Sequence, residues 1–379
     1  MRKKYLCFLL VICLCLGGCG WMSGSYVSVE PHLERNKPND TDDISASNYY
    51  QLRSALVEIV RSGIESATIN VSKYDEGLLS GNMEIAARYV TNMDPIGAYA
   101  VEEVKYEIGT KGGKPAIAVQ ISYLRSRGEL RSIRYVDGMK DAADVIEESL
   151  RDCDSGVVLM IENYQETDFA QMVSDYGETY PQEVMEIPQV AASVYPDSGT
   201  ERVVELTFTY QTSRETLRQM QTQVAPVFNA AALYVSGEGA DSQKYAQLYA
   251  FLMERFDYEI TTSITPTYSL LRHGVGDNRA FALVYAAMCR LAGLECMTVT
   301  GTRDGEPWCW NIVRDNENYC HVDLLRCSAL GDFREFTDED MDGYVWDYSA
   351  YPACNPQLPG EEPPAPTEEP ENPTGEPTA

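Results

Sequence analysis

The sequence predicts an α+β protein in which two small α/β modules precede a larger C-terminal domain. Three observations support this fold class. Between about residues 45 and 235, amphipathic helical patterns alternate with short β-branched runs. A motif within this segment occurs twice. Between about residues 245 and 351, helical patterns are followed by three successive strand-like runs.

The N-terminus has the pattern of an export signal, which we assign to residues 1–18. A basic start, Arg2-Lys3-Lys4, precedes an apolar run that is too short to span a bilayer as a mature helix. The sequence Leu16-Gly17-Gly18-Cys19 then resembles the lipobox of bacterial lipoproteins, whose cysteine receives a diacylglyceryl group and becomes the new N-terminus. We therefore expect Cys19 to be lipidated. An ordinary secretory signal with a chance cysteine is the alternative.

Residues 19–45 are expected to form a polar spacer between the lipid and the folded body. Because two acyl chains anchor stably, the protein should lie on the extracytoplasmic face of the cell membrane. The formal net charge of −28 opposes binding to nucleic acid or to anionic lipid. The lipid on Cys19 therefore has to supply the membrane attachment.

Cysteine usage bears on redox state and on metal binding. Seven cysteines follow Cys19 in the sequence: Cys153, Cys289, Cys296, Cys309, Cys320, Cys327 and Cys354. Seven is an odd number, so at least one is unpaired within the chain. The exported compartment permits disulfides, but no CxxC spacing of a zinc site is present, and we expect neither a metal nor a cofactor.

The two predicted modules cover residues 46–140 and 141–236. The pattern I-S-Y-x-x-S-R-x-x-L-R over 121–131 recurs as F-T-Y-x-x-S-R-x-x-L-R over 208–218. The flanking patterns also correspond, since in each module a helix precedes a strand, a second helix and a hairpin. We interpret this as a diverged duplication, with chance similarity as the alternative. Neither module concentrates chemically competent residues.

The elements of the C-terminal domain, residues 240–354, follow in a clear order. A helix over 245–256 leads through a loop to a second helix, whose apolar residues recur at steps of three and four and whose N-cap is Asp277 or Asn278. Gly293 ends that helix. Strands are predicted over 296–301, 308–314 and 319–325. The tail, 355–379, has eight prolines, six glutamates and no basic residue, and we expect it to be disordered.

Three motifs in this domain carry a family resemblance. The chain reads G-V-G-D-N-R-A-F-A-L-V-Y-A-A-M-C-R-L-A-G-L from residue 274, G-E-P-W-C-W-N-I-V from 305 and N-Y-C-H-V-D from 318. These resemble the transglutaminase-like family of papain-type cysteine enzymes. Its members read G-V-C-x-G-x-A-x-A-F-x-x-L-C-R-x-A-G-I, then G-x-x-H-A-W-N-x-V, then W-Y-H-V-D. The resemblance covers about a hundred residues and implies a C-terminal papain-like fold.

The resemblance also implies that the catalytic triad is degenerate. In active members a helix N-terminus stabilises the cysteine thiolate, a histidine is the base and an aspartate orients that histidine. Aligned on its first glycine, the helix motif places Gly276 at the cysteine position, and the other two motifs place Trp308 at the histidine position and Asp323 at the aspartate position. Glycine offers no nucleophile and tryptophan no proton acceptor. We therefore expect a pseudoenzyme.

Two interpretations of the remaining site stay open. Trp308 and Trp310 should share a strand face near Asp323. Trp308 either fills the emptied cleft, or the two rings hold a peptide or glycan while Asp323, Asp277 and Asn278 supply polar contacts. We favour a lipoprotein that binds or scaffolds a peptide, cell-wall or exported protein partner, and a purely structural spacer is a further possibility.

The enzyme alternative is a thiol peptidase or transamidase with relocated catalytic residues. Cys309 and Cys320 should face away from the site, because successive side chains of a strand point to opposite faces. His273 lies in a loop that could reach the cleft, and His321 shares a strand face with Asp323. Buried or disulfide-bonded cysteines are the simpler expectation.

Overall fold

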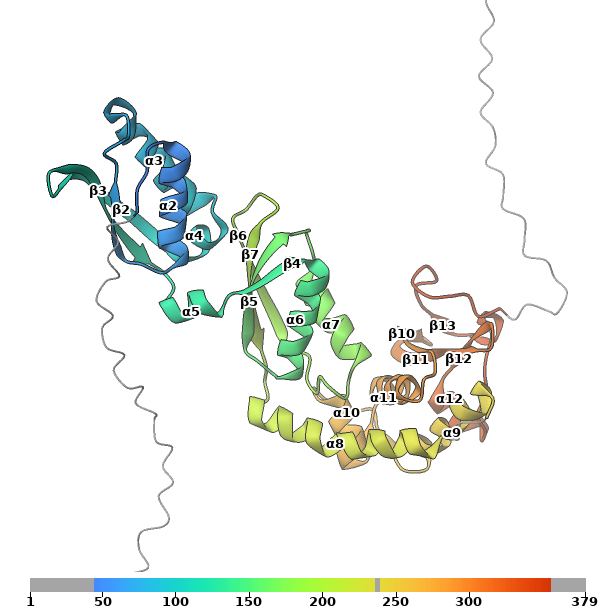
Figure 1. The fold of residues 1–379 in the computed structure, drawn as a ribbon. Helices are drawn as coiled ribbons and strands as arrows, with labels where there is room; N and C mark the ends of the chain where they lie inside the picture. The colour runs from blue at the N-terminus through green and yellow to red at the C-terminus, as the bar shows by residue number, and fades with distance from the viewer. Residues whose placement is uncertain (1–43, 236–238, 356–379) are drawn as a thin grey trace, which may run out of the picture. The chain divides into compact units, whose positions relative to one another are not determined.

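The computed structural model describes residues 44–235 and 239–355 (Figure 1). The expected signal at 1–18, the lipidation site Cys19, nearly all of the spacer and nearly all of the acidic tail lie outside the described residues. The described chain has the expected mixed α+β architecture. It divides into two compact units, one formed by residues up to 90 with 102–123, the other by 91–101 with 124 onward.

The first unit is built on a three-stranded sheet in the order β1-β3-β2. Its elements are α2 (Tyr49–Arg61), β1 (Ser66–Asn70), α3 (Glu76–Asn92), β2 (Val101–Lys111) and β3 (Lys114–Tyr123). Leu52, Leu56 and Ile59 of α2 are buried at helical spacing, as expected of an amphipathic helix. Strand β1 ends at Asn70, whose side-chain oxygen accepts from the backbone N–H of Ser72 in a turn.

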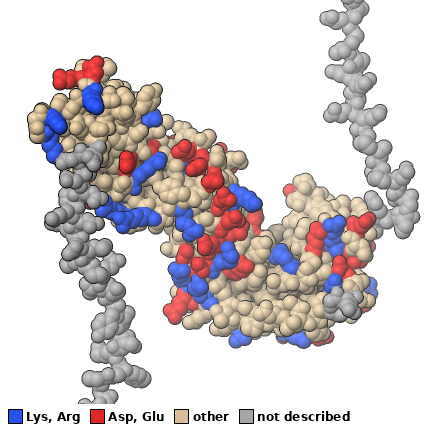
Figure 2. All heavy atoms as spheres, in the orientation of Figure 1, with Lys and Arg blue, Asp and Glu red and all other residues tan. Residues whose placement is uncertain are grey.

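The second unit begins with a four-stranded sheet in the order β4-β5-β7-β6. Its elements are α4 (Pro95–Ala100), α5 (Arg127–Ser132), β4 (Arg134–Gly138), α6 (Met139–Arg151), β5 (Gly156–Asn163), α7 (Phe169–Thr179), β6 (Gln189–Tyr195) and β7 (Arg202–Thr209). Strand β4 lies in the range expected for the first module, yet it pairs in parallel with β5 of this second sheet. The core under α6 and α7 includes Ile146, Leu159, Val173 and Leu206. Acidic and basic side chains intermingle over these two helices (Figure 2).

The repeated motif marks the same strand-to-helix turn in both sheets. Its first copy ends β3, and Ser126 then caps α5 by accepting from the backbone N–H of Glu129 at 3.2 Å. Its second copy ends β7, and Ser213 caps α8 (Arg214–Tyr234) by accepting from the backbone N–H of Thr216 at 3.2 Å. The serine at this position is therefore a helix cap in both copies.

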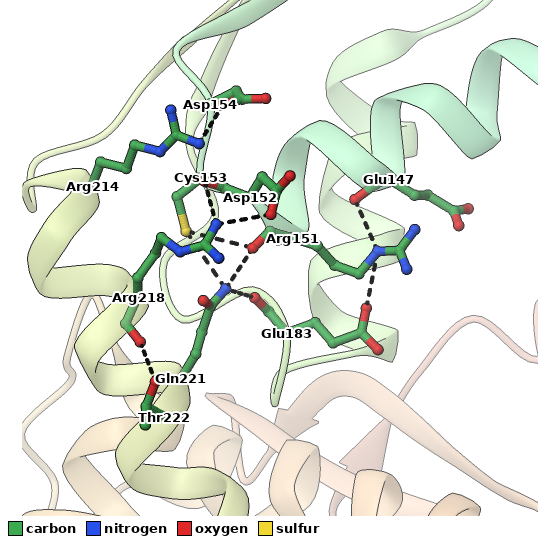
Figure 3. Close-up of polar contacts among 10 residues, drawn as sticks. All are labelled: Glu147, Arg151, Asp152, Cys153, Asp154, Glu183, Arg214, Arg218, Gln221 and Thr222. Atoms are coloured by element: carbon green, nitrogen blue, oxygen red, sulfur yellow. Dashed lines mark hydrogen bonds and ion pairs between the residues drawn. The ribbon is translucent and has the colours of Figure 1, made fainter.

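Helix α8 is held against the end of α6 by a polar network (Figure 3). Arg218 pairs with Asp152 at 2.8 Å, and Arg214 pairs with Asp154 at 2.8 Å. Gln221 donates to the backbone carbonyl of Arg151 at 2.9 Å. These contacts join the second sheet's helices to the helix that leads into the C-terminal domain.

The C-terminal domain packs a buried helix against an antiparallel sheet in the order β12-β11-β10-β13. Its larger elements are α9 (Asp241–Met253), α11 (Asn278–Leu291), β10 (Cys296–Arg303), β11 (Glu306–Asp315), β12 (Asn318–Val322), α12 (Leu324–Leu330) and β13 (Tyr344–Val345). Its shorter elements are β8 (Asp257–Tyr258), α10 (Pro266–Tyr268), a π-helical turn (Ser269–His273), β9 (Val275–Gly276) and a 3₁₀ turn (Asp338–Asp340). Every residue from Ala280 to Cys289 is buried, so α11 is the central element of the core.

The predicted helices and the three predicted strands of this domain are confirmed, although their ends differ by a few residues from the predicted ones. The last strand ends at Val322 rather than Leu325, because Asp323 caps α12 and its side chain accepts from the backbone N–H groups of Leu325 and Arg326. Within the part of the chain that the structure describes, no helix combines the length and the apolar character needed to cross a membrane.

Candidate functional site

The start of α11 faces strand β11 and is the first part of the candidate site. Asp277 is the N-cap, and its carboxylate accepts from the backbone N–H of Ala280 at 2.8 Å. Asn278 is the first residue of the helix, and its side-chain oxygen accepts from the backbone N–H of Cys309 at 3.0 Å. Both expected polar residues are half-buried. Asn278 thus joins the helix start to the strand position next to Trp308.

Gly276 does not lie at this helix start, so the expectation that it occupies the cysteine position is wrong. It belongs to β9, where it pairs with Tyr258, ahead of the helix cap. A Cβ added at Gly276 would lie 2.9 Å from the Cβ of Ala280 and 3.1 Å from Cδ1 of Leu270. The motif spacing agrees: the family's cysteine precedes its arginine by 12 positions, and Asn278, not Gly276, lies 12 positions before Arg290.

Trp308 and Asp323 form a direct hydrogen bond across β11 and the end of β12. The indole N–H of Trp308 donates to Oδ2 of Asp323 at 2.9 Å, and the Tyr344 hydroxyl donates to the same oxygen at 2.6 Å. The other oxygen, Oδ1, accepts from the backbone N–H groups of Leu325 and Arg326 at 3.0 and 3.1 Å. Burial raises the pKa of Tyr344 most, and the negative charge of Asp323 raises it further. Residues of the chain therefore occupy both oxygens of this carboxylate.

The indole ring of Trp308 is held from two further sides. The guanidinium of Arg303 lies 5.2 Å from the ring centroid, and the ring of Tyr258 lies 6.2 Å away. Arg303 also approaches Asp323, at 3.6 Å. Trp308 is half-buried and packs against the same apolar cluster as Trp310. The ring is therefore positioned by a cation–π contact and by the carboxylate together.

Two of the expected binding residues are inaccessible to a ligand. Trp310 is 1% exposed and Asp323 is 2% exposed. The space bounded by Asn278, Cys309, Asn311 and Asp323 is too small to hold a water molecule. The expectation that Trp310 and Asp323 contact a peptide or glycan is therefore wrong, because core packing and internal hydrogen bonds use both side chains.

Comparison with known proteins identifies the domain to which this site belongs. Residues 229–324 match the family model of the transglutaminase-like superfamily. The chain contains a transglutaminase-like domain. No curated protein matches the chain significantly.

Three solved structures are similar to parts of the chain. A TGase is 10% identical, with 57% of this chain and 63% of that chain covered and a TM-score of 0.25. A candidate cysteine protease from Cytophaga hutchinsonii is 15% identical, with coverage of 42% and 70% and a TM-score of 0.25. A candidate protease from Parabacteroides distasonis is 10% identical, with coverage of 67% and 40% and a TM-score of 0.22. The chain thus spans under two thirds of the TGase's length.

His321 of the transglutaminase-like domain is fully buried and fully hydrogen-bonded. Its Nδ1 accepts from the indole N–H of Trp310 at 2.9 Å, which leaves the proton on Nε2, and Nε2 donates to Asp338 at 2.9 Å. Burial lowers the pKa of His321, although the hydrogen bond to Asp338 opposes this shift. His321 therefore has no free nitrogen with which to act as a relocated base.

The same hydrogen bonds bear on metal binding. Ligand atoms of His321, Asp338 and Cys354 lie within 4.8 Å of one another, the one such group of three among the described residues. Metal-bound histidine normally donates its second N–H to an acceptor. Here Trp310 can only donate, so Nε2 would have to lose its proton to bind a metal. These residues do not fit a metal ion.

The described cysteines do not resemble activated nucleophiles. All seven are free thiols, and six are buried while Cys320 is half-buried. Burial raises the pKa of Cys320 and Cys327 to about 11 and that of Cys354 to about 12. The pKa of Cys309 is also raised by burial, and its sulfur lies 3.8 Å from the Thr300 hydroxyl. Such thiols are protonated at neutral pH and react slowly.

Sequence reasoning missed three residues that complete the site. Arg303 of β10 and Tyr258 of β8 contact the Trp308 ring, and Tyr344 of β13 donates to the same oxygen of Asp323 as Trp308 does. These strands are far apart along the chain. No local pattern marks the three residues. His273, the other histidine considered as a base, is exposed and packs edge-on against Tyr268 at 5.3 Å.

Proposed function

We propose that the transglutaminase-like domain is noncatalytic and acts by binding or scaffolding a partner. The observation that carries this proposal is the hydrogen bond from Trp308 to Asp323. In an active family member the aspartate would accept a hydrogen bond from the histidine base. The indole of Trp308 keeps that hydrogen bond but has no lone pair with which to take a proton from a nucleophile. The orienting interaction is present without the base.

Asn278 is proposed to stand at the position of the family's cysteine. It begins α11, contacts the residue next to Trp308 and has the spacing to Arg290 that the family motif requires. Its amide is not a nucleophile and its oxygen already accepts a hydrogen bond. Loss of both reacting groups argues against covalent catalysis, because each is needed by the same catalytic unit.

Trp308 is proposed to fill the volume of the former cleft. Its large indole ring can occupy the combined volume of a histidine side chain and the open groove beside it. The absence of room for water between Asn278 and Asp323 supports this. A partner would then contact exposed surfaces of the domain. Its class, a peptide, a cell-wall component or an exported protein, stays a proposal, as does display on the extracytoplasmic face of the membrane through lipid on Cys19.

We also propose that the two sheets preceding the domain arose by duplication. The orders β1-β3-β2 and β5-β7-β6 are equivalent, and the repeated motif forms the same strand-to-helix turn after β3 and after β7. A further parallel exists at the sheet edge. Ser45 forms a parallel bridge to Asn70 of β1, and Gly138 of β4 pairs in parallel with Asn163 of β5.

The experiment is an assay of the purified full chain for amine incorporation and for peptide hydrolysis, combined with timed alkylation of its thiols at neutral pH. We expect neither activity, and no thiol that reacts faster than a small-molecule thiol. Hydrolysis or amine incorporation that disappears in the Cys320→Ser or His273→Ala variant would support the competing enzyme, a thiol peptidase or transamidase with relocated residues. Cross-linking on intact cells that recovers no partner would count against the proposed binding role and against a structural role as an assembly unit of an exported complex.

A further inference from the structure

A cavity of about 170 Å³ lies away from Trp308, at the junction of the second sheet's helices with α11. Its wall comes from the end of α7 with the loop that follows it, from residues 263–267 before and within α10, and from one face of α11. Arg279 of α11 pairs with Glu178 of α7 at 2.9 Å, and Arg290 donates to the backbone carbonyl of Thr179. These contacts join α7 and α11.

A buried carboxylate lines this cavity. Glu186 is 5% exposed, and its two oxygens accept from the backbone N–H groups of Gln211 and Thr212 at 2.5 and 3.0 Å. Among the described residues no lysine or arginine pairs with Glu186. Buried charges are normally paired, and each carboxylate oxygen can accept another hydrogen bond, so Glu186 can bind a cationic group.

A guanidinium group lines the same cavity. Arg279 has five N–H donors, and its hydrogen bond to Glu178 uses one of them. Arg279 and Glu186 both face the cavity but form no ion pair with each other. A ligand that carries both a positive and a negative charge could pair with Glu186 and with Arg279 at the same time.

The remaining wall and the volume limit the ligand's size and polarity. Apolar side chains complete the lining: Val184, Ile187, Ile264, Pro266 and Leu283. At roughly 30 Å³ for each water-sized group, the cavity holds on the order of five or six such groups. That is the size of an α-amino acid such as alanine or valine, well below the several hundred Å³ typical of larger ligands.

We propose that this cavity binds a small aliphatic α-amino acid. Its ammonium group pairs with Glu186, its carboxylate with Arg279, and its side chain contacts the apolar wall near Leu283. This goes beyond the proposed noncatalytic role, because the site is separate from Trp308 and Asp323. Ligand binding here would stabilise the junction between the second sheet's helices and the transglutaminase-like domain.

Calorimetric titration of the purified full chain tests this site with L-alanine, D-alanine and L-valine. Isobutylamine and isobutyrate, which each lack one charge, serve as matched probes, and L-phenylalanine tests the size limit. We expect saturable binding of at least one small amino acid and at least about tenfold weaker binding of the single-charge probes, the cost of one lost charge-assisted hydrogen bond. The absence of saturable binding by all three small amino acids overturns the proposal. Equal affinity for isobutylamine overturns the role of Arg279.

Two kinds of variant assign the binding to this cavity. Arg279→Gln should weaken amino-acid binding at least about tenfold but leave binding of isobutylamine unchanged. Since Glu186 also supports the backbone of Gln211 and Thr212, a variant that keeps it is needed. Ile264→Trp fills the cavity from its rim and should abolish binding. Ile260→Trp adds the same bulk to the same loop at a residue that is 83% exposed and outside the lining, and should bind normally. Normal binding by Ile264→Trp overturns the proposal.

Discussion

The surroundings of Asp323 and of Glu186 show two ways in which this chain buries a carboxylate. Asp323 accepts from Trp308, Tyr344 and two backbone N–H groups, and the adjacent space excludes water. Glu186 accepts from two backbone N–H groups only and lines a cavity of about 170 Å³. The family resemblance singles out Asp323 as a site residue. The unused hydrogen-bonding capacity of Glu186 and the free volume beside it instead favour Glu186 as a ligand-binding residue.

Removal of the Asp323 carboxylate should have the largest effect on stability. Asp323→Ala leaves the indole N–H of Trp308, the hydroxyl of Tyr344 and two backbone N–H groups without their acceptor. At about 1–3 kcal/mol for each buried unsatisfied group, we expect a loss of at least about 3 kcal/mol in the free energy of unfolding. Urea denaturation measures it. Asp277→Ala, which removes a half-buried cap, should lose only about 1 kcal/mol, and equal losses would contradict the structural role assigned to Asp323.

Substitution of Gly276 tests the corrected register. Gly276→Cys places a side chain against Ala280 and Leu270, at distances below normal contact, and should destabilise the domain by about 1–3 kcal/mol. Asn278→Cys, at the start of α11, adds no such overlap and replaces a side chain of similar size. Thermal unfolding of the two variants compares them. If Gly276→Cys is as stable as the wild type, the packing described around β9 is incorrect.

Introduction of the family's cysteine and histidine at positions 278 and 308 should create a reactive thiol. In Asn278→Cys combined with Trp308→His, the imidazole next to Asp323 can accept the thiol proton, and the helix N-terminus favours the thiolate. We expect alkylation of the new cysteine at neutral pH to be at least about tenfold faster than in Asn278→Cys alone. Mass spectrometry of timed iodoacetamide reactions measures the rate. Equal rates in the two variants would argue that Asn278 and position 308 do not face each other.

The buried histidine predicts a smaller, pH-dependent effect. Because the folded state lowers the pKa of His321, the unfolded chain binds a proton more readily near its usual pKa of about 6.5. The free energy of unfolding should therefore decrease as the pH is lowered from about 6.5 to the pKa of His321 in the folded state. Urea denaturation between pH 7 and 5 tests this, with His321→Asn as the variant in which the slope diminishes. His273→Asn, a change at an exposed histidine, should keep the wild-type slope.

Much of the C-terminal fold could be predicted because the signals are local. The apolar spacing from Phe281 to Leu291 and the cap at Asp277 predicted α11, and strand patterns separated by turns predicted β10, β11 and β12. The site could be predicted only in part. Trp308 next to Asp323 followed from the motifs, but Gly276 was misplaced because the first glycine of the motif, rather than the helix, set the alignment.

By itself the sequence determined the mixed α+β class and the transglutaminase-like motif, since each depends on residue type and spacing along the chain. Tertiary structure decided which groups are accessible and which are paired. Trp310 and Asp323 are buried through contacts with Tyr344 and His321. Glu186 and Arg279 line one cavity that is formed by segments distant in the sequence. Burial and pairing depend on packing between such segments, which no local pattern records.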